Sequence, residues 1–390
     1  MESLGITLFA VIVSSVVGVV IGRFLASKAD GPTGPIPARD YFQGLNHLLN
    51  ERPDLAVETF IKALPVDDET IDTHLALGTL VRRRGEVDKA IRIHQNVLAR
   101  KDLTRENKVQ AELELARDYL QAGLHDRSEH LLDDLVHKAE VRRTALGHLL
   151  EIYQRERDWK QAEEIGQKLL DGDDGSVRMA LAHFLCERCD EALIAGELRQ
   201  ARVFVERAMG YQHCFRVALT LARVEFESKE YRKSLQCLAD AQAIRPELAS
   251  ETLELFKDAS KPLGADAEYV TFVEHAIEEH PEARLVDELA NLKADQDGSK
   301  SAMKFLGSQL ARRPSLSGFS RYIAECELAD EDVPLSDMRR LRTYTESIVS
   351  SRPKYRCQNC GFSGRLLFWQ CPSCRLWESL RLVREFDEPL

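Results

Sequence analysis

The pattern of apolar and polar positions divides the chain into three regions. Residues 4 to 22 form a run of 19 residues without a charged side chain. From residue 40 onward, apolar residues recur at helical spacing in paired segments. The last forty or so residues lose this periodicity and bring four cysteines close together. The pattern therefore predicts a membrane span, a long helical region and a small C-terminal module.

The uncharged run has the length of a transmembrane helix, because 19 residues span about 28 Å. Glu2 is the only charged side chain before the run, so the positive segment of a cleaved signal peptide is missing. We interpret residues 1–22 as a retained anchor; a buried core helix is the alternative. Arg23, Lys28 and Arg39 follow the run, and the positive-inside rule then places residues 23 to 390 in the cytoplasm.

Two short features surround the end of the span. Gly18 and Gly22 are spaced like the small residues that pack transmembrane helices together, so homo-oligomerisation through the anchor stays open. Residues 23–39 contain the stretch DGPTGPIP, with three prolines in eight residues. Proline stiffens such a stretch, and we interpret residues 23–39 as a linker.

Residues 40–350 repeat with a period of 34 residues. Gly78 and Ala90 lie 34 residues after Gly44 and Ala56, in the order of the tetratricopeptide pattern. Small residues at these positions let the two helices of a unit approach closely, and stacking buries the apolar face that each unit exposes. The sequence predicts an all-α tetratricopeptide-repeat superhelix of about nine units, whose later members, after Pro246, are degenerate.

A superhelix of this kind has a concave groove that binds peptides or other proteins. The repeat register places four residues on the inner helix faces, and we predict them to be partner-binding: Thr79, Arg82, Arg117 and Leu120. The alternative is that Arg82 belongs to an ordinary solvated helix end.

Composition and motifs argue against several classes of function. The chain has 53 basic and 64 acidic residues, a net charge of −11, which disfavours nucleic-acid binding. It contains no Walker loop or dinucleotide-binding glycine motif. Cys186 and Cys189 have redox-motif spacing, but they lie within a continuous helical pattern. We expect no catalytic residues, and a protein that is not an enzyme.

The strongest motif consists of two Cys-x-x-Cys pairs separated by ten residues: Cys357 with Cys360, and Cys371 with Cys374. Four thiolates at this spacing can converge on one tetrahedral ion, which is zinc or iron. Two disulfides are the alternative, which a cytoplasmic location disfavours. Because four cysteines leave no open position for water, the ion is structural or transfers electrons. We predict that residues 351–390 form a rubredoxin-like module that folds with its ion.

The same module concentrates positive charge. Between residues 352 and 384 there are seven basic residues and one acid, Glu378. Such a module can dock onto the acidic repeats or contact anionic lipid headgroups; ordinary solvated charge is the alternative. The arginines are also the only feature that favours a zinc-ribbon nucleic-acid binder.

The order of these elements is specific. The anchor, the segment RRRGEVDKAIRIHQNVL and the terminal KYRCQNCGF and FWQCPSCRLW resemble the lipopolysaccharide assembly protein B family of Gram-negative bacteria over nearly the whole chain. The resemblance implies a single-pass inner-membrane adaptor with a periplasmic N-terminus and with Cys357, Cys360, Cys371 and Cys374 as metal ligands. Implied partners are a membrane-anchored AAA+ zinc protease, the UDP-3-O-acyl-N-acetylglucosamine deacetylase whose turnover it promotes, and other lipopolysaccharide assembly proteins. An iron electron carrier is the alternative from another class.

Overall fold

A computed structural model describes residues 70–170, 174–312, 315–328 and 352–383, with a few isolated residues at 46–47, 59, 342–343, 345–346 and 349–350. The expected anchor and linker, residues 1–39, lie outside this part of the chain. None of the helices that the structure describes is both long and apolar enough to cross a membrane. The chain divides into two units, residues 1–145 and 146–390, each of which we describe by itself.

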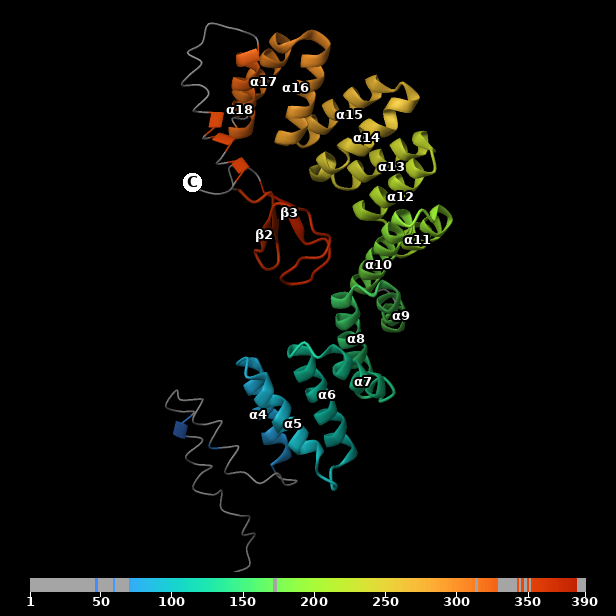
Figure 1. The fold of residues 1–390 in the computed structure, drawn as a ribbon, viewed down its shortest axis with the longest axis vertical. Helices are drawn as coiled ribbons and strands as arrows, with labels where there is room; N and C mark the ends of the chain where they lie inside the picture. The colour runs from blue at the N-terminus through green and yellow to red at the C-terminus, as the bar shows by residue number, and fades with distance from the viewer. Residues whose placement is uncertain are drawn as a thin grey trace, which may run out of the picture. The chain divides into compact units, whose positions relative to one another are not determined.

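Both units are built from helices joined by short turns (Figure 1). The first unit contains α4 (Ile71–Arg83), α5 (Val87–Leu98), α6 (Arg105–Gln121) and α7 (His125–Leu135), and the unit boundary falls in the first turn of α8 (Arg142–Glu156). The second continues with α9 (Trp159–Leu169), α10 (Gly175–Ile194), α11 (Leu198–Tyr211), α12 (Phe215–Glu227) and α13 (Tyr231–Ile244). Consecutive helices pack as pairs, for example α4 with α5 and α12 with α13. The described helices thus confirm the all-α repeat array.

In five of the helix pairs, the first helix ends at a residue with left-handed backbone conformation, and the turn to the second helix follows. The next residue donates its N–H to a carbonyl five residues earlier, an arrangement that ends a helix with satisfied carbonyls. Glycine has no steric cost in this conformation. The turn residues, with their φ angles, are Gly85 (85°), Gly123 (75°), Arg157 (58°), Gly196 (75°) and Lys229 (64°).

The small residues of the repeat lie between the two helices of a pair, as expected. Ser128 is fully buried, and its hydroxyl donates to the Ala116 carbonyl at 2.8 Å. Ser234 and Ala222 make the same bond at the same length in a later pair. Each serine therefore satisfies its own polar atom while allowing the helices to approach closely.

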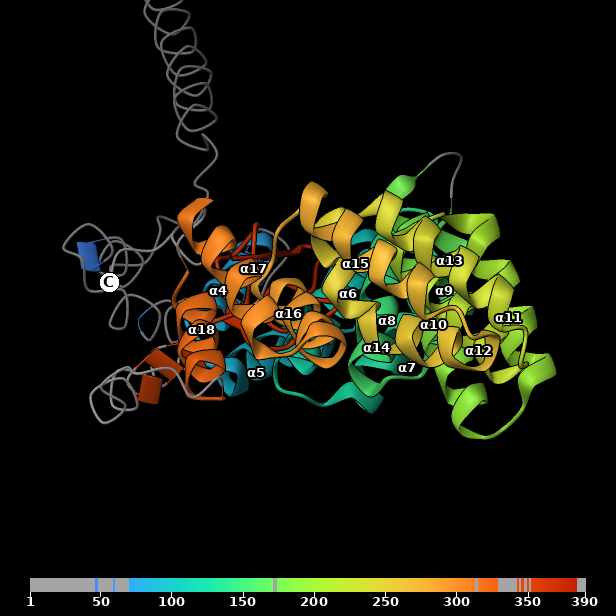
Figure 2. The same cartoon turned by 90° about the horizontal axis from the view of Figure 1, so that it is seen from above.

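Beyond Pro246 the helices are less regular but continue. The 3₁₀ helix η1 (Pro246–Glu251) leads into the short α14 (Leu253–Ser260) and the 3₁₀ helix η2 (Lys261–Leu263). The remaining helices are α15 (Asp266–Glu279), α16 (Ala283–Asp297), α17 (Ser299–Arg312) and α18 (Leu316–Leu328). Seen from above, α12 to α15 are neighbours (Figure 2), and they contact one another in chain order. The array therefore persists where the sequence pattern is weak, and the number of units stays a prediction.

The last described segment, residues 352–383, forms a small antiparallel ribbon. Its strands are β1 (Tyr355–Cys357), β2 (Ser363–Gly364) and β3 (Leu380–Leu382), with β1 in the centre. Tyr355, Cys357, Cys371 and Leu380 are buried in the same apolar cluster as residues of α12 to α16. The ribbon therefore belongs to the core of the second unit.

Candidate metal centre

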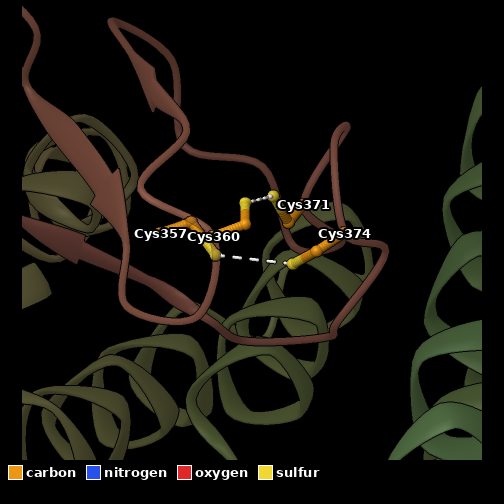
Figure 3. Close-up of side chains that lie close together, drawn as sticks. All are labelled: Cys357, Cys360, Cys371 and Cys374. Carbon is orange, nitrogen blue, oxygen red and sulfur yellow. Dashed lines mark hydrogen bonds between the residues drawn. The ribbon is translucent and has the colours of Figure 1, made fainter. Parts of the chain in front are cut away.

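The four cysteines of the ribbon converge on one point. Cys357 and Cys360 extend from one loop and Cys371 and Cys374 from another, with their sulfurs directed toward each other (Figure 3). The Sγ atoms of Cys357 and Cys374 are 3.6 Å apart, those of Cys360 and Cys371 are 3.7 Å apart, and all four lie within 4.8 Å of one another. Sulfurs bound tetrahedrally at 2.3 Å would be about 3.8 Å apart. The donor set therefore fits one tetrahedral zinc or iron ion.

The two loops that carry the cysteines have the same backbone geometry. In each, the N–H of the residue after the second cysteine donates to the carbonyl of the first, at 3.0 Å in one loop and 2.9 Å in the other. That residue is left-handed in both cases: Gly361 has φ 76° and Arg375 has φ 58°. At Gly361 the residue type itself indicates this conformation, because glycine adopts it without steric cost. Arg375 carries no such signal, because its Cβ makes the same conformation unfavourable.

The surroundings of the cysteines shift the pKa values of their thiols in different directions. The hydroxyl of Ser379 lies 3.3 Å from the sulfur of Cys357, and this contact lowers the pKa of Cys357 to about 6. A backbone hydrogen bond at Phe362 lowers the pKa of Cys360. Burial raises the pKa of Cys371 to about 11. Two of the ligands thus favour the thiolate, the form that binds metal, before an ion arrives. Sequence reasoning missed Ser379, which lies outside both Cys-x-x-Cys pairs.

Aromatic and apolar side chains attach the ribbon to the repeats. Trp369 lies 5.9 Å from the ring of Phe215, centroid to centroid, and the guanidinium carbon of Arg216 lies 5.0 Å from the centre of the Trp369 ring. Trp377 meets the ring of Phe184 edge to face at 5.8 Å. These contacts pack one side of the ribbon against α10 and α12.

Polar contacts surround this apolar interface between the ribbon and the repeats. The Tyr355 hydroxyl donates to Glu251 at 2.5 Å, and Lys354 pairs with the same carboxylate at 3.1 Å. Arg375 pairs with Glu151 of α8 at 3.2 Å. Burial alone would raise the pKa of Glu251, but the bonds from Tyr355 and Lys354 outweigh it and lower the pKa. The docking of a basic ribbon onto acidic repeats is thereby confirmed.

The four residues predicted to bind a partner lie on α4 and α6. Three of them surround the buried Glu114: the guanidinium of Arg82 is 2.6 Å from its carboxylate, Arg117 is at 2.5 Å and the Thr79 hydroxyl at 3.0 Å. Arg82 and Leu120 are buried in the first unit, whereas Thr79 and Arg117 are half-buried. Burial raises the pKa of Glu114 less than these neighbours lower it. Contact of these residues with a partner stays a prediction.

The Cys186–Cys189 pair occupies fully buried positions of α10. Burial raises the pKa of each thiol to about 12. Thiols of this kind are poor nucleophiles. This agrees with their interpretation as ordinary positions of a helix.

The fold and the cysteine cluster together define a tetratricopeptide-repeat protein with a rubredoxin-like metal-binding ribbon. A family model described as a tetratricopeptide repeat matches residues 73–108, and one described as a rubredoxin metal binding domain matches residues 355–381. Lipopolysaccharide assembly protein B of Escherichia coli (strain K12) is 34% identical over 377 residues, which cover 96% of this chain and 97% of the relative. The protein of the same name from Haemophilus influenzae is 31% identical over 383 residues, covering 95% and 96%. The chain belongs to the lipopolysaccharide assembly protein B family.

Likeness to solved structures is weaker. A crystal structure of a tetratricopeptide repeat protein from Parabacteroides merdae aligns with 78% of this chain and 97% of its own at 15% identity, with a TM-score of 0.30. A structure of Naa15/Naa10 bound to HypK-THB covers 81% of this chain and 50% of its own at 12% identity, with a TM-score of 0.44.

Proposed function

We propose that this protein is an inner-membrane scaffold that regulates lipopolysaccharide biosynthesis. The observation that carries the proposal is the alignment with two proteins named lipopolysaccharide assembly protein B over 95–96% of the chain, repeats and ribbon together. In this proposal residues 1–22 hold the chain in the membrane. The repeats bind the UDP-3-O-acyl-N-acetylglucosamine deacetylase and bring it to a membrane-anchored AAA+ protease for turnover. Membrane anchoring raises the effective concentration of the scaffold near such a protease.

The ribbon gives the scaffold a second surface. Because it shares a buried core with α12 to α16, a client that contacts both repeats and ribbon meets one continuous body. Its four cysteines hold one ion, zinc or iron, and the closed thiolate shell makes that ion a folding element of the ribbon. Visible absorption of the purified protein together with a metal assay distinguishes the two ions. A coloured iron protein with reversible reduction would favour the electron carrier instead.

Depletion of the protein in its own cell tests the adaptor function. We expect the deacetylase to become more abundant and longer-lived, measured by immunoblot after translation is blocked. Wild-type protein should restore rapid turnover, and so should Cys237→Ser, which alters a half-buried cysteine of α13 outside the metal centre. Cys357→Ser/Cys360→Ser should not restore it. An unchanged deacetylase half-life on depletion would refute the proposal.

Photo-cross-linking locates the client. A cross-linking amino acid at the half-buried Thr79 or Arg117 should capture the deacetylase in membranes, whereas one at the exposed Lys160 of α9 serves as a control position. Capture from Lys160 alone would place the binding surface elsewhere and refute the predicted residues.

A further inference from the structure

A second set of metal-ligating side chains lies where the ribbon meets the repeats. His183 comes from α10, Cys214 is the residue that precedes α12, and Glu378 comes from the ribbon between Cys374 and β3. One ligand atom from each of the three lies within 4.8 Å of the other two. None of them belongs to the four-cysteine cluster, so the group needs its own explanation.

The imidazole of His183 is buried without a hydrogen bond. The side chain is fully inaccessible to solvent, and neither ring nitrogen has a hydrogen-bond partner. Its Nε2 lies at an ion-pair distance of 3.5 Å from Oε1 of Glu378, and that oxygen is also buried without a hydrogen bond. Buried polar atoms nearly always have partners, because leaving them unpaired costs free energy. The contact between Nε2 and Oε1 is an ion pair only when the imidazole is protonated, and burial of His183 disfavours that form. A metal ion bound by Nε2 and Oε1 would satisfy both atoms with a neutral imidazole.

The surroundings hold these two side chains in place. Trp377 stacks on His183 with centroids 4.5 Å apart and an interplanar angle of 18°. Glu378 has φ 49°, a left-handed conformation that is unfavourable for a residue with a side chain. Its N–H donates to the Trp369 carbonyl at 2.7 Å, which fixes the backbone in this position. The ribbon is therefore shaped to direct this carboxylate toward α10.

We propose that His183, Cys214 and Glu378 bind a zinc ion, with water in the fourth position. Imidazole, thiolate and carboxylate are the three donor types that zinc takes from proteins. Nitrogen and oxygen ligands of a tetrahedral zinc lie about 3.4 Å apart, close to the 3.5 Å between Nε2 of His183 and Oε1 of Glu378.

Charge also balances at this site. The two positive charges of zinc are matched by one thiolate and one carboxylate when the imidazole is neutral. Burial lowers the pKa of His183, which favours this neutral ligand form, and raises the pKa of Cys214. The Cys214 thiol gives up its proton to solvent when the Zn–S bond forms, so binding releases one proton.

The bound ion would join α10, the start of α12 and the ribbon. This second site therefore differs in role from the four-cysteine centre: it fastens the ribbon to the repeats, whereas the first organises the ribbon itself. The proposal does not depend on the adaptor function.

Metal content of the full-length protein in detergent tests the proposal. The protein is incubated with excess Zn²⁺, desalted, and analysed for zinc and iron by mass spectrometry. We expect two ions per wild-type chain and one in Cys214→Ser and in Glu378→Gln. Cys189→Ser, which alters another fully buried cysteine at the same interface of α10, α11 and α12, should keep two. One ion in the wild type, or two in both site variants, would overturn the proposal.

Cobalt supplies a readout that depends on the ligands themselves. In the Co²⁺-loaded protein, Cys214→Ser should lose the charge-transfer absorption of one thiolate out of five, while Cys189→Ser should lose none. Glu378→Gln keeps the side-chain size, so it remains a valid test where Cys214→Ser does not fold. Identical cobalt spectra for wild type and Cys214→Ser would also overturn the proposal.

Discussion

The bond between Tyr355 and Glu251 offers a direct test of how firmly the ribbon is held on the repeats. Tyr355 is 1% exposed, and its hydroxyl donates to Glu251 at 2.5 Å. The change Tyr355→Phe removes this one bond and keeps the ring in the apolar cluster. Lys354 still pairs with Glu251 at 3.1 Å and Arg284 at 4.0 Å, so the carboxylate retains two charged partners.

A hydrogen bond to a charged group contributes about 1.5–3 kcal/mol. Because the bond joins ribbon to repeats, its loss should lower the free energy of ribbon opening by that amount. Hydrogen exchange reports such local opening. Exchange of amides in residues 355–382 should therefore accelerate about ten- to hundredfold in Tyr355→Phe, while exchange in α10 and α11 should change much less.

Tyr269→Phe is the matched control. The Tyr269 hydroxyl donates to Glu288 at 2.8 Å, and Lys257 pairs with Glu288 at 2.9 Å. A tyrosine, a lysine and a glutamate therefore make the same contacts here as at Glu251, but all three belong to the helices. This variant should leave ribbon exchange at the wild-type rate. Ribbon exchange in Tyr355→Phe that equals that of wild type would refute the view that this bond holds the ribbon.

Three further changes test the packing, the metal centre and the charged contacts of Glu151 on α8. In Gly78→Ala the new Cβ would lie 2.3 Å from a buried histidine ring, and overpacking of this kind costs about 1–3 kcal/mol, measured as a lower unfolding midpoint. Cys357→Ser/Cys360→Ser should lose the ribbon ion and all exchange protection of residues 355–382, measured by metal content and hydrogen exchange. Glu151 has a pKa of about 2, chiefly through a hydrogen bond with His148, against an ordinary value of 4.5. Its folded-state pKa is lowered, so its stabilising effect is complete above pH 4.5 and is lost as the pH falls toward 2. The stability difference between wild type and Glu151→Gln should shrink over that range.

Each of these has its own contrary result, and the glycine change has a matched control. Gly147→Ala, at a helix position with no atom within 4 Å of the new Cβ, should stabilise by up to about 1 kcal/mol; equal losses in both glycine variants would contradict the packing argument. Retained ribbon protection in the double cysteine variant would show that the ion is dispensable for folding. A stability difference for Glu151→Gln that is constant from pH 6 to 3 would contradict the assigned pKa.

Local patterns were enough to predict the repeats and the cysteine cluster. Gly78 and Ala90 mark the contacts between paired helices, because only small side chains let the helices approach closely at these positions. The Cys-x-x-Cys spacing likewise encodes the ligand geometry within a few residues. Arg157 and Lys229 take the left-handed turn conformation without a glycine, since the surrounding helix pair fixes the backbone there.

What the sequence did not reveal depends on contacts between distant segments. Tyr355 reaches a glutamate 104 residues earlier in the chain. Arg82 was assigned to an inner helix face by the repeat register, but the next repeat supplies Glu114, and the side chain is buried against it. From the sequence alone, His183 is an isolated histidine on an apolar helix, and only the folded chain shows that the ribbon packs against it. Periodicity identifies the face of a helix and not what packs against that face.

The shared core of ribbon and repeats has a consequence for biosynthesis. Phe215 is translated roughly 150 residues before Trp369, the ring that packs against it. At a synthesis rate of 5–20 residues per second, Phe215 therefore lacks this packing partner for about 8 to 30 s. During that interval the nascent chain presents an aromatic surface that a chaperone would recognise. Loading of the four cysteines then becomes the closing step of maturation, so a cell short of the metal would accumulate chains whose repeats are formed but still uncovered.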